Sequence, residues 1–220
     1  MPNRASELVW DDEASAADGG LTRAAVVRAA IAIADADGLD TVSMRHVAAA
    51  LGVRPMSLYT HVASKDDLLE LMVNEVVAEA LVPDPLPEGW REAMRAVAHH
   101  SYNAFVAHPW TLEAYGRGAR LGPNALRHAE QSAAAVAPLG LAAEDACRVL
   151  AIVDEYTIGH ALRGLTFDED TVRERFPVID PEQHPELHRL GYPGMADPRE
   201  DFEQGLEVVL DGVAQRYARR

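Results

Sequence analysis

The sequence predicts an all-α protein in which a small N-terminal unit of three helices precedes a larger C-terminal helical domain. Apolar residues recur every three or four positions in segment after segment, and no segment alternates with the period of two that is typical of strands. The run Val82-Pro83-Asp84-Pro85-Leu86-Pro87 separates the two parts, because proline lacks a backbone donor and restrains the residue before it.

The first helix is predicted between Thr22 and Gly38. Thr22 can serve as its N-cap, Gly38 can end it, and the apolar residues between them fall on one face. Residues 1–20 lack this periodicity and end in Asp18-Gly19-Gly20, so we expect a flexible acidic arm there.

Two shorter helices follow, joined by a tight turn. The second helix runs from its N-cap Ser43 to Leu51, and Gly52 supplies the left-handed residue that reverses the chain. The third helix spans Pro55 to His61, since proline is tolerated in a first turn. The residues expected to hold it in the core are Leu58 and Val62.

The remainder of the chain predicts longer helices. A capping box at Ser64–Asp67 opens a helix that continues to Leu81. Later helices are expected near Trp90–Val106, Pro109–Tyr115, Pro123–Ala137, Glu144–Leu165 and Asp197–Tyr217. Residues 166–196 contain Pro177, Pro181, Pro185 and Pro193, which predicts a long connection with at most a short helix.

Charge restricts where a polyanion could bind. The chain has a formal net charge of −15, which excludes a protein that coats nucleic acid with its whole surface. Residues 21–65 carry five cations against three carboxylates, a net charge of +2 within an otherwise acidic chain. These cations are Arg23, Arg28, Arg45, Arg54 and Lys65. Nucleic-acid contact is therefore expected in this segment.

The compartment is predicted from what the sequence lacks. Cys147 is the single cysteine, so no internal disulfide can form and a reducing compartment is favoured. No segment approaches the roughly 20 apolar residues that a membrane-spanning helix needs, and the N-terminus is acidic where a signal peptide would be basic. We expect a cytoplasmic protein without a membrane partner.

The two short helices around Gly52 form the pattern of a helix-turn-helix, in which the second helix enters the major groove of DNA. Spacing places Leu58 and Val62 inside and leaves hydroxyl, phenol and imidazole groups outside, where they can contact phosphates and base edges. Arg45 could pair with a guanine. An alternative is that these are two ordinary surface helices of a helical bundle.

Three runs make the pattern specific. Leu51-Gly52-Val53, Ser57-Leu58-Tyr59-Thr60-His61-Val62 and Lys65-Asp66-Asp67-Leu68-Leu69 together resemble the TetR (tetracycline repressor) family. Tyr156-Thr157-Ile158-Gly159 and Phe202-Glu203-Gln204-Gly205-Leu206-Glu207 are similar to dimerisation helices of the tetracycline-repressor subgroup. Pro55 and Met56 depart from that repressor's recognition helix, so the operator sequence is not carried over.

The resemblance implies a sequence-specific transcriptional regulator, a repressor that a small-molecule effector releases from a palindromic operator. It implies a flexible arm at 1–20, a DNA-binding helix-turn-helix domain at 21–65, a connecting helix at 66–82, and a ligand-binding and dimerisation domain at 83–220. The predicted DNA-binding residues are Ser43, Arg45, Arg54, Ser57, Tyr59, Thr60, His61 and Lys65.

The C-terminal domain is expected to bind the effector and a second copy of the chain. An apolar stripe with glycines, formed by Phe202, Gly205, Leu206, Val209, Leu210, Gly212, Val213 and Tyr217, predicts a homodimer interface; the alternative is a core helix of a monomer. The predicted effector-binding residues, polar and aromatic groups among alanines and valines, are His100, Phe105, Trp110, Tyr115, Tyr156 and His160.

No cofactor or metal is expected. His184 and His188 have a metal-compatible spacing, but no third ligand accompanies them. Arg163 stands where the tetracycline repressor has a glutamate that helps to hold magnesium-tetracycline, and a cation there would repel the metal. Two other functions stay open: a helical ligand-binding or adaptor protein that binds no DNA, and an acid–base enzyme, for which no catalytic motif is present.

Overall fold

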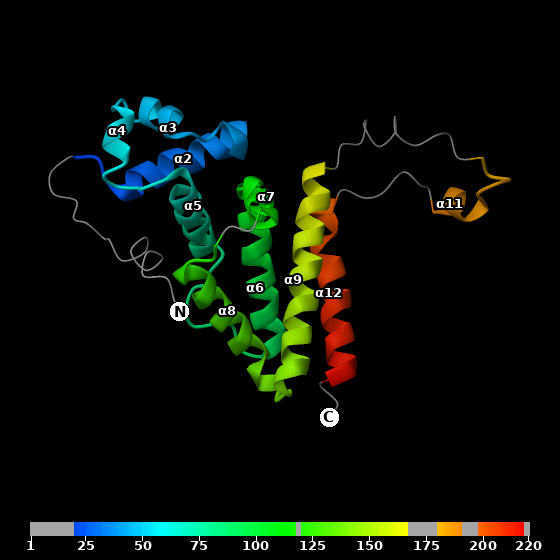
Figure 1. Cartoon of the computed structure of the whole chain (residues 1–220). Helices are drawn as coiled ribbons and strands as arrows, with labels where there is room; N and C mark the ends of the chain where they lie inside the picture. Colours follow the sequence, from blue (N-terminus) through cyan, green and yellow to red (C-terminus); the bar gives the residue numbers. More distant parts are fainter. Residues whose placement is uncertain (1–19, 118–119, 167–179, 191–197, 218–220) are drawn as a thin grey trace. The chain divides into compact units, whose positions relative to one another are not determined.

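The computed structural model describes residues 20–117, 120–166, 180–190 and 198–217, and every element within these ranges is helical (Figure 1). The all-α prediction is confirmed. The chain divides into two compact units, Met1–Ala135 and Val136–Arg220. This division lies after the predicted boundary at the prolines, so the functional domains drawn from the sequence stay a prediction.

The N-terminal unit begins with the predicted three-helix pattern. Its elements are α2 (Arg23–Asp37), η1 (Leu39–Thr41), α3 (Met44–Ala50), α4 (Pro55–Leu58), α5 (Lys65–Glu79), α6 (Trp90–Ala107), α7 (Trp110–Gly116) and α8 (Pro123–Val136). The predicted N-caps are confirmed. The hydroxyl oxygens of Thr22, Ser43 and Ser64 accept hydrogen bonds from the third residue after each, at 3.1, 3.2 and 3.0 Å.

One helix is shorter than predicted. α4 ends at Leu58 instead of His61, because the next residues close a turn. The backbone N–H groups of His61 and Val62 both donate to the carbonyl oxygen of Leu58 at 2.9 Å, and the Thr60 hydroxyl donates to the carbonyl oxygen of Ser57 at 2.8 Å. The Thr60 hydroxyl thus takes the carbonyl oxygen of Ser57, with which a backbone N–H would pair if the helix continued.

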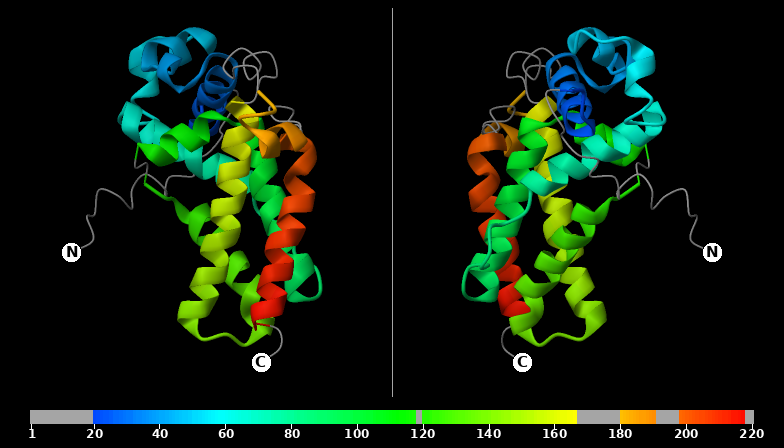
Figure 2. Two further views of the ribbon diagram at one scale, coloured as in Figure 1. Left: turned by 90° about the vertical axis from the view of Figure 1, so that its right-hand side faces the viewer. Right: turned by 90° about the vertical axis from the view of Figure 1, so that its left-hand side faces the viewer.

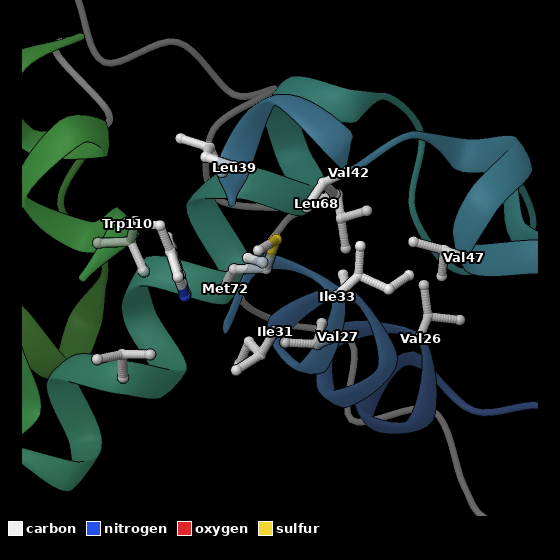
Figure 3. Packing of buried hydrophobic residues seen from close by; sticks show 14 of the residues in the cluster. Val26, Val27, Ile31, Ile33, Leu39, Val42, Val47, Leu68, Met72 and Trp110 are labelled. Carbon is white, nitrogen blue, oxygen red and sulfur yellow. The ribbon is translucent and has the colours of Figure 1, made fainter. Parts of the chain in front are cut away.

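The core of this unit lies between α2, α3, α4 and α5 (Figure 3). Leu68 and Met72 of α5 are fully buried, as are Val26 of α2 and Val47 of α3. Their spacing along each helix puts them on one face, which is why the sequence pattern predicted them. Trp110 of α7 belongs to the same cluster. α5, the helix that follows α4, therefore shares one hydrophobic core with α4.

The C-terminal unit is built on two long helices. Its elements are η2 (Ala137–Leu139), α9 (Ala143–Thr166), the short α11 (Pro185–Arg189) and α12 (Pro198–Tyr217). α9 and α12 lie side by side in all views (Figures 1 and 2). Within the described part of the 166–196 connection, α11 is a short helix of the kind predicted there; residues 167–179 and 191–197 lie outside the described residues.

The apolar stripe of α12 packs inside the chain against α9, and its part in a dimer stays a prediction. Phe202, Leu206, Leu210, Val213 and Tyr217 are buried, and Val209 is half-buried. The rings of Tyr156 on α9 and Phe202 stack with centroids 5.6 Å apart. Because this stripe is already covered within one chain, a partner chain would also need the remaining exposed faces.

The two stripe glycines have different surroundings. A Cβ added at Gly205 would lie 2.2 Å from the Tyr156 hydroxyl oxygen, whereas at Gly212 it would meet nothing within 4 Å. The predicted close approach of helices is confirmed for Gly205 and not for Gly212. Tyr156 cannot easily yield, because its hydroxyl donates to the Phe202 carbonyl oxygen at 2.8 Å.

We expect Gly205→Ala to lower the free energy of unfolding by roughly 1–3 kcal/mol, since the new methyl group forces Tyr156 from its place. The matched control Gly212→Ala should be neutral or stabilising by up to about 1 kcal/mol, because alanine favours a helix. Urea unfolding at equal protein concentration measures both. Equal effects of the two substitutions would contradict the proposed packing.

Candidate nucleic-acid interface

The turn between α3 and α4 presents the short helix outward. Gly52 has a φ of 66°, a left-handed conformation that glycine adopts without strain. The N–H of Val53 donates to the carbonyl oxygen of Ala48 at 3.0 Å, which closes the end of α3. The chain can therefore reverse within a few residues and start α4 at Pro55.

α4 and the turn after it have one buried and one exposed side. Leu58 has no exposed surface and Val62 is 3% exposed, so both hold the segment in the core. Tyr59 is 45% exposed, and Ser57 and Thr60 are exposed beside it. The predicted separation of core residues from outward polar groups is confirmed for Ser57, Tyr59 and Thr60, whereas His61, also predicted outside, is half-buried. This face offers hydroxyl groups and an aromatic ring to a partner.

The remaining predicted contact residues surround this face. His61 is half-buried, and its carbonyl oxygen accepts from Nε of Arg23 at 3.1 Å. Arg45, Arg54 and Lys65 are exposed, and no ion pair joins any of them to a residue that the structure describes. Free cations next to hydroxyl groups suit a polyanion. Whether each one contacts DNA stays a prediction.

Ser43 has a structural role in addition to any binding role. Its hydroxyl oxygen caps α3 by accepting from the backbone N–H of His46, and its side chain is exposed. The Arg23 contact with His61 was missed by the sequence analysis. An arginine near the start of a helix carries no pattern that indicates a partner 38 positions away.

The predicted effector residues occupy different surroundings. Tyr156 and His160 lie together on α9, with ring centroids 5.4 Å apart, and both contact the ring of Phe202. His100 and Phe105 are half-buried on α6. Tyr115 on α7 is 51% exposed, so it does not contribute to an enclosed wall.

Trp110 lies in the N-terminal core. Its ring is buried, and its indole N–H donates to Oδ1 of Asp35 at 2.7 Å. α7 follows α6 after a single break at Pro109, which brings the ring to α2. The role of Trp110 in effector binding stays a prediction.

One polar pair in the C-terminal part of this unit was not predicted. Ser101 of α6 is buried, and its hydroxyl lies 2.9 Å from Nε2 of His128 on α8. Burial lowers the pKa of His128, which keeps the imidazole neutral near pH 7. A neutral imidazole can donate or accept a hydrogen bond, as a polar group in an effector site must. Neither residue stood out from its alanine-rich surroundings in the sequence.

Among the residues that the structure describes, no three His, Cys, Asp or Glu side chains come together as metal ligands. His184 lies at the N-cap of the short α11, and His188 lies within that helix. None of the described helices has the length and apolar character needed to cross a membrane.

Comparison with known proteins is decisive for the family. A model described as "Bacterial regulatory proteins, tetR family" matches residues 26–72, and one described as "Tetracyclin repressor-like, C-terminal domain" matches residues 82–217. The chain belongs to the TetR family. The first match contains the turn, α4 and most of α5, and the second contains α6 to α12.

Among TetR family members, the HTH-type transcriptional repressor DrrR1 of Streptomyces coeruleorubidus is 35% identical, over 99% of this chain and 87% of its own. Crystal structures of the Streptomyces coelicolor TetR family protein ActR share the fold. Its complex with (S)-DNPA has a TM-score of 0.74 at 29% identity, over 90% of this chain and 99% of ActR. Its complex with actinorhodin has a TM-score of 0.75 at 28% identity, with the same coverage.

Ser43→Ala is expected to lower the free energy of unfolding by about 1 kcal/mol, because the N–H of His46 loses its cap. Ser43→Asp, which keeps a cap oxygen, should stay near the original stability, and Ser57→Ala should have almost no effect. Thermal or urea unfolding checks all three. If Ser43→Ala and Ser57→Ala were equally stable, the cap would contribute nothing measurable.

Proposed function

We propose that this TetR family protein is a transcriptional repressor that binds operator DNA through α3 and α4 and is released by a small molecule. One observation carries the proposal: Leu58 and Val62 are buried while Ser57, Tyr59 and Thr60 are exposed on the opposite side. That arrangement leaves a short helix with a hydrogen-bonding face, of the width that a major groove admits.

Charge supports the same site. Arg45, Arg54 and Lys65 are exposed around the hydrogen-bonding face, on a chain whose formal net charge is −15. The cations can neutralise phosphates, and the acidic remainder disfavours indiscriminate binding. Specific recognition would then depend on the base edges read by Tyr59 and its neighbours. The cytoplasm, where bacterial DNA lies, is the expected compartment.

The relatives support repression and ligand control. DrrR1 is named a transcriptional repressor, and ActR has been crystallised with (S)-DNPA and with actinorhodin. By analogy, this chain binds a small-molecule effector. The predicted contacts stay Tyr156 and His160 on α9 and, in the N-terminal unit, His100 and Phe105 on α6. Effector and operator must then weaken each other's binding by the same factor. The relatives are regulators of transcription, and we propose no enzymatic activity.

Selection of genomic DNA fragments on the purified protein tests the function. A repressor should enrich a small set of fragments with a shared palindrome, and their affinity should fall steeply as salt rises. Retention of fragments without any common sequence would favour a ligand-binding or adaptor protein instead. The enriched fragment then serves as the operator in the experiments below.

Tyr59→Ala should weaken operator binding by roughly 10- to 100-fold for each half-site, the usual cost of one specific base or phosphate contact. The thermal midpoint should change by less than about 2 °C, because the ring is 45% exposed. Tyr115→Ala, which removes a ring that is 51% exposed on α7, is the matched control and should bind normally. Fluorescence anisotropy measures the affinities, and an unchanged affinity for Tyr59→Ala would exclude the ring from the interface.

A homodimer is the expected assembly, because two half-sites about 34 Å apart need two recognition helices related by a two-fold axis. The exposed apolar residues of the C-terminal unit supply a surface for it. Val208 on α12 is 72% exposed, and Leu162 and Leu165 on α9 are exposed as well. Water-exposed apolar groups on two adjacent long helices are typical of a helix-bundle interface.

Val208→Asp should shift the protein from a dimer to the 23.9 kDa monomer at micromolar concentration, since a buried unpaired charge is costly. Leu126→Asp on α8, where the replaced side chain is 75% exposed, is the matched control and should remain a dimer. Sedimentation or light scattering gives the masses. A dimer that tolerates Val208→Asp would place the interface elsewhere.

A further inference from the structure

His108 joins two helices of the N-terminal unit. Its Nδ1 lies 2.8 Å from Oδ1 of Asp35 on α2, and its Nε2 lies 3.1 Å from Oε2 of Glu79, the last residue of α5. Its own backbone N–H donates to the carbonyl oxygen of Ala104 at 2.9 Å, which fixes the residue at the end of α6. We call these contacts the His108 bridge.

The bridge requires a proton. A neutral imidazole has one N–H and can donate to one carboxylate, whereas the imidazolium donates from both nitrogens. Both nitrogens here face carboxylate oxygens. The His108 side chain is 12% exposed, whereas those of Asp35 and Glu79 are 31% and 55% exposed, so water screens the Glu79 contact more than the Asp35 contact. The deprotonated ring would lose one of the two hydrogen bonds and would leave two carboxylates facing a neutral group.

Each element packed on His108 contributes to its charge state. Burial lowers the pKa of His108, but the hydrogen bonds and charges of Asp35 on α2 and Glu79 on α5 outweigh it and raise the pKa above 6.5. α6 supplies the carbonyl group of Ala104, and α7 supplies the neutral ring of Trp110, edge-on at 6.3 Å. A raised pKa means that the bridge is complete below pH 6.5 and is lost as pH rises through the folded-state value.

The His108 bridge joins helices that share a hydrophobic core with α4 to the rest of the N-terminal unit. α2 forms one wall of the core that buries Leu58 of α4, and α5 starts directly after the recognition turn. Asp35 also accepts from the indole of Trp110, so a single carboxylate holds α2 to His108 at the end of α6 and to α7. None of these residues belongs to the predicted DNA contacts.

We propose that His108 is a positioning residue for operator binding, which fixes α2 relative to α5 and α6 by donating to Asp35 and Glu79 together. Loss of its proton releases α2 and changes the affinity of the recognition helix for DNA. The operator part of this proposal rests on the proposed function, whereas the bridge itself does not.

The first experiment tests the bridge without DNA, in the full chain. Proton and carbon NMR of the histidine rings should show one resonance that titrates above pH 6.5 and disappears in His108→Gln. The thermal midpoint of the unaltered protein should exceed that of His108→Gln by roughly 2–4 °C at pH 6, and this gap should close by pH 8.5. A gap that stays constant with pH, or a His108 resonance that titrates below 6.5, overturns the bridge.

Two controls separate the bridge from general effects of pH. His188→Gln removes an exposed histidine on α11 and should leave the pH dependence unchanged. Asp40→Asn removes the partner of Arg117, a 2.8 Å ion pair between α7 and the helix-turn-helix segment, but the guanidinium stays charged throughout this range. If Asp40→Asn lowered the thermal midpoint by an amount that also vanished by pH 8.5, the pH dependence could not be assigned to His108.

The second experiment measures affinity for the selected operator fragment between pH 6 and 8.5 at constant salt. For each protein, the affinity at pH 6 is divided by the affinity at pH 8.5. This ratio should differ by at least about threefold between the unaltered protein and His108→Gln. Apart from His108, the two proteins carry the same side chains, so a difference between their ratios can be assigned to His108. Equal ratios would show that His108 stabilises the unit without positioning the helix. Failure to select any operator would refute the proposed function, while the first experiment still decides the bridge.

Discussion

Burial of Leu58 and Val62 is the constraint on which the rest of the candidate site depends. α4 is one turn long, too short to be stable by its own hydrogen bonds. Its place is fixed by two apolar side chains that the core of α2, α3 and α5 encloses. Once these are inside, Tyr59 and Thr60 between them are left exposed, and they hold phenol and hydroxyl groups that can contact DNA, whereas His61 is half-buried.

The same core explains why α5 matters beyond its own packing. Leu68, Met72, Val73 and Val76 fill the space beside α2. Burial of this face fixes which side of α5 points inward. Hydrogen bonds from polar residues along the same helix add directional contacts that fix its register.

Much of this could be predicted from sequence, and the reasons are local. The caps at Thr22, Ser43 and Ser64 depend on a hydroxyl group and the three residues after it, which the sequence displays directly. Tyr59 was predicted outward because Leu58 and Val62 set the helical phase. The helix ends were within a few residues, apart from α4, where the Thr60 hydroxyl takes the carbonyl of Ser57.

What could not be predicted depends on pairing between distant segments. Nothing in the sequence indicated that the indole of Trp110 would donate to Asp35, because only the fold returns α7 to α2. Periodicity predicted the apolar stripe of α12, but it shows which residues share a face without showing what covers that face. Ser101 with His128, and His108 with Asp35 and Glu79, likewise join segments that no local pattern connects.

The polar contacts of α5 suggest how a signal could reach the recognition helix. Glu70 is buried and accepts from Arg120 at 2.7 Å, Asn74 exchanges two hydrogen bonds of 2.9 Å with Asn124, and Glu79 meets His108. A hydrogen bond weakens steeply beyond its normal distance, and a buried carboxylate without a partner is costly. A displacement of α5 would break these contacts, so they hold the helix in the position observed. An effector that prefers a displaced α5 would have to overcome them, and its binding would shift the population of the N-terminal unit.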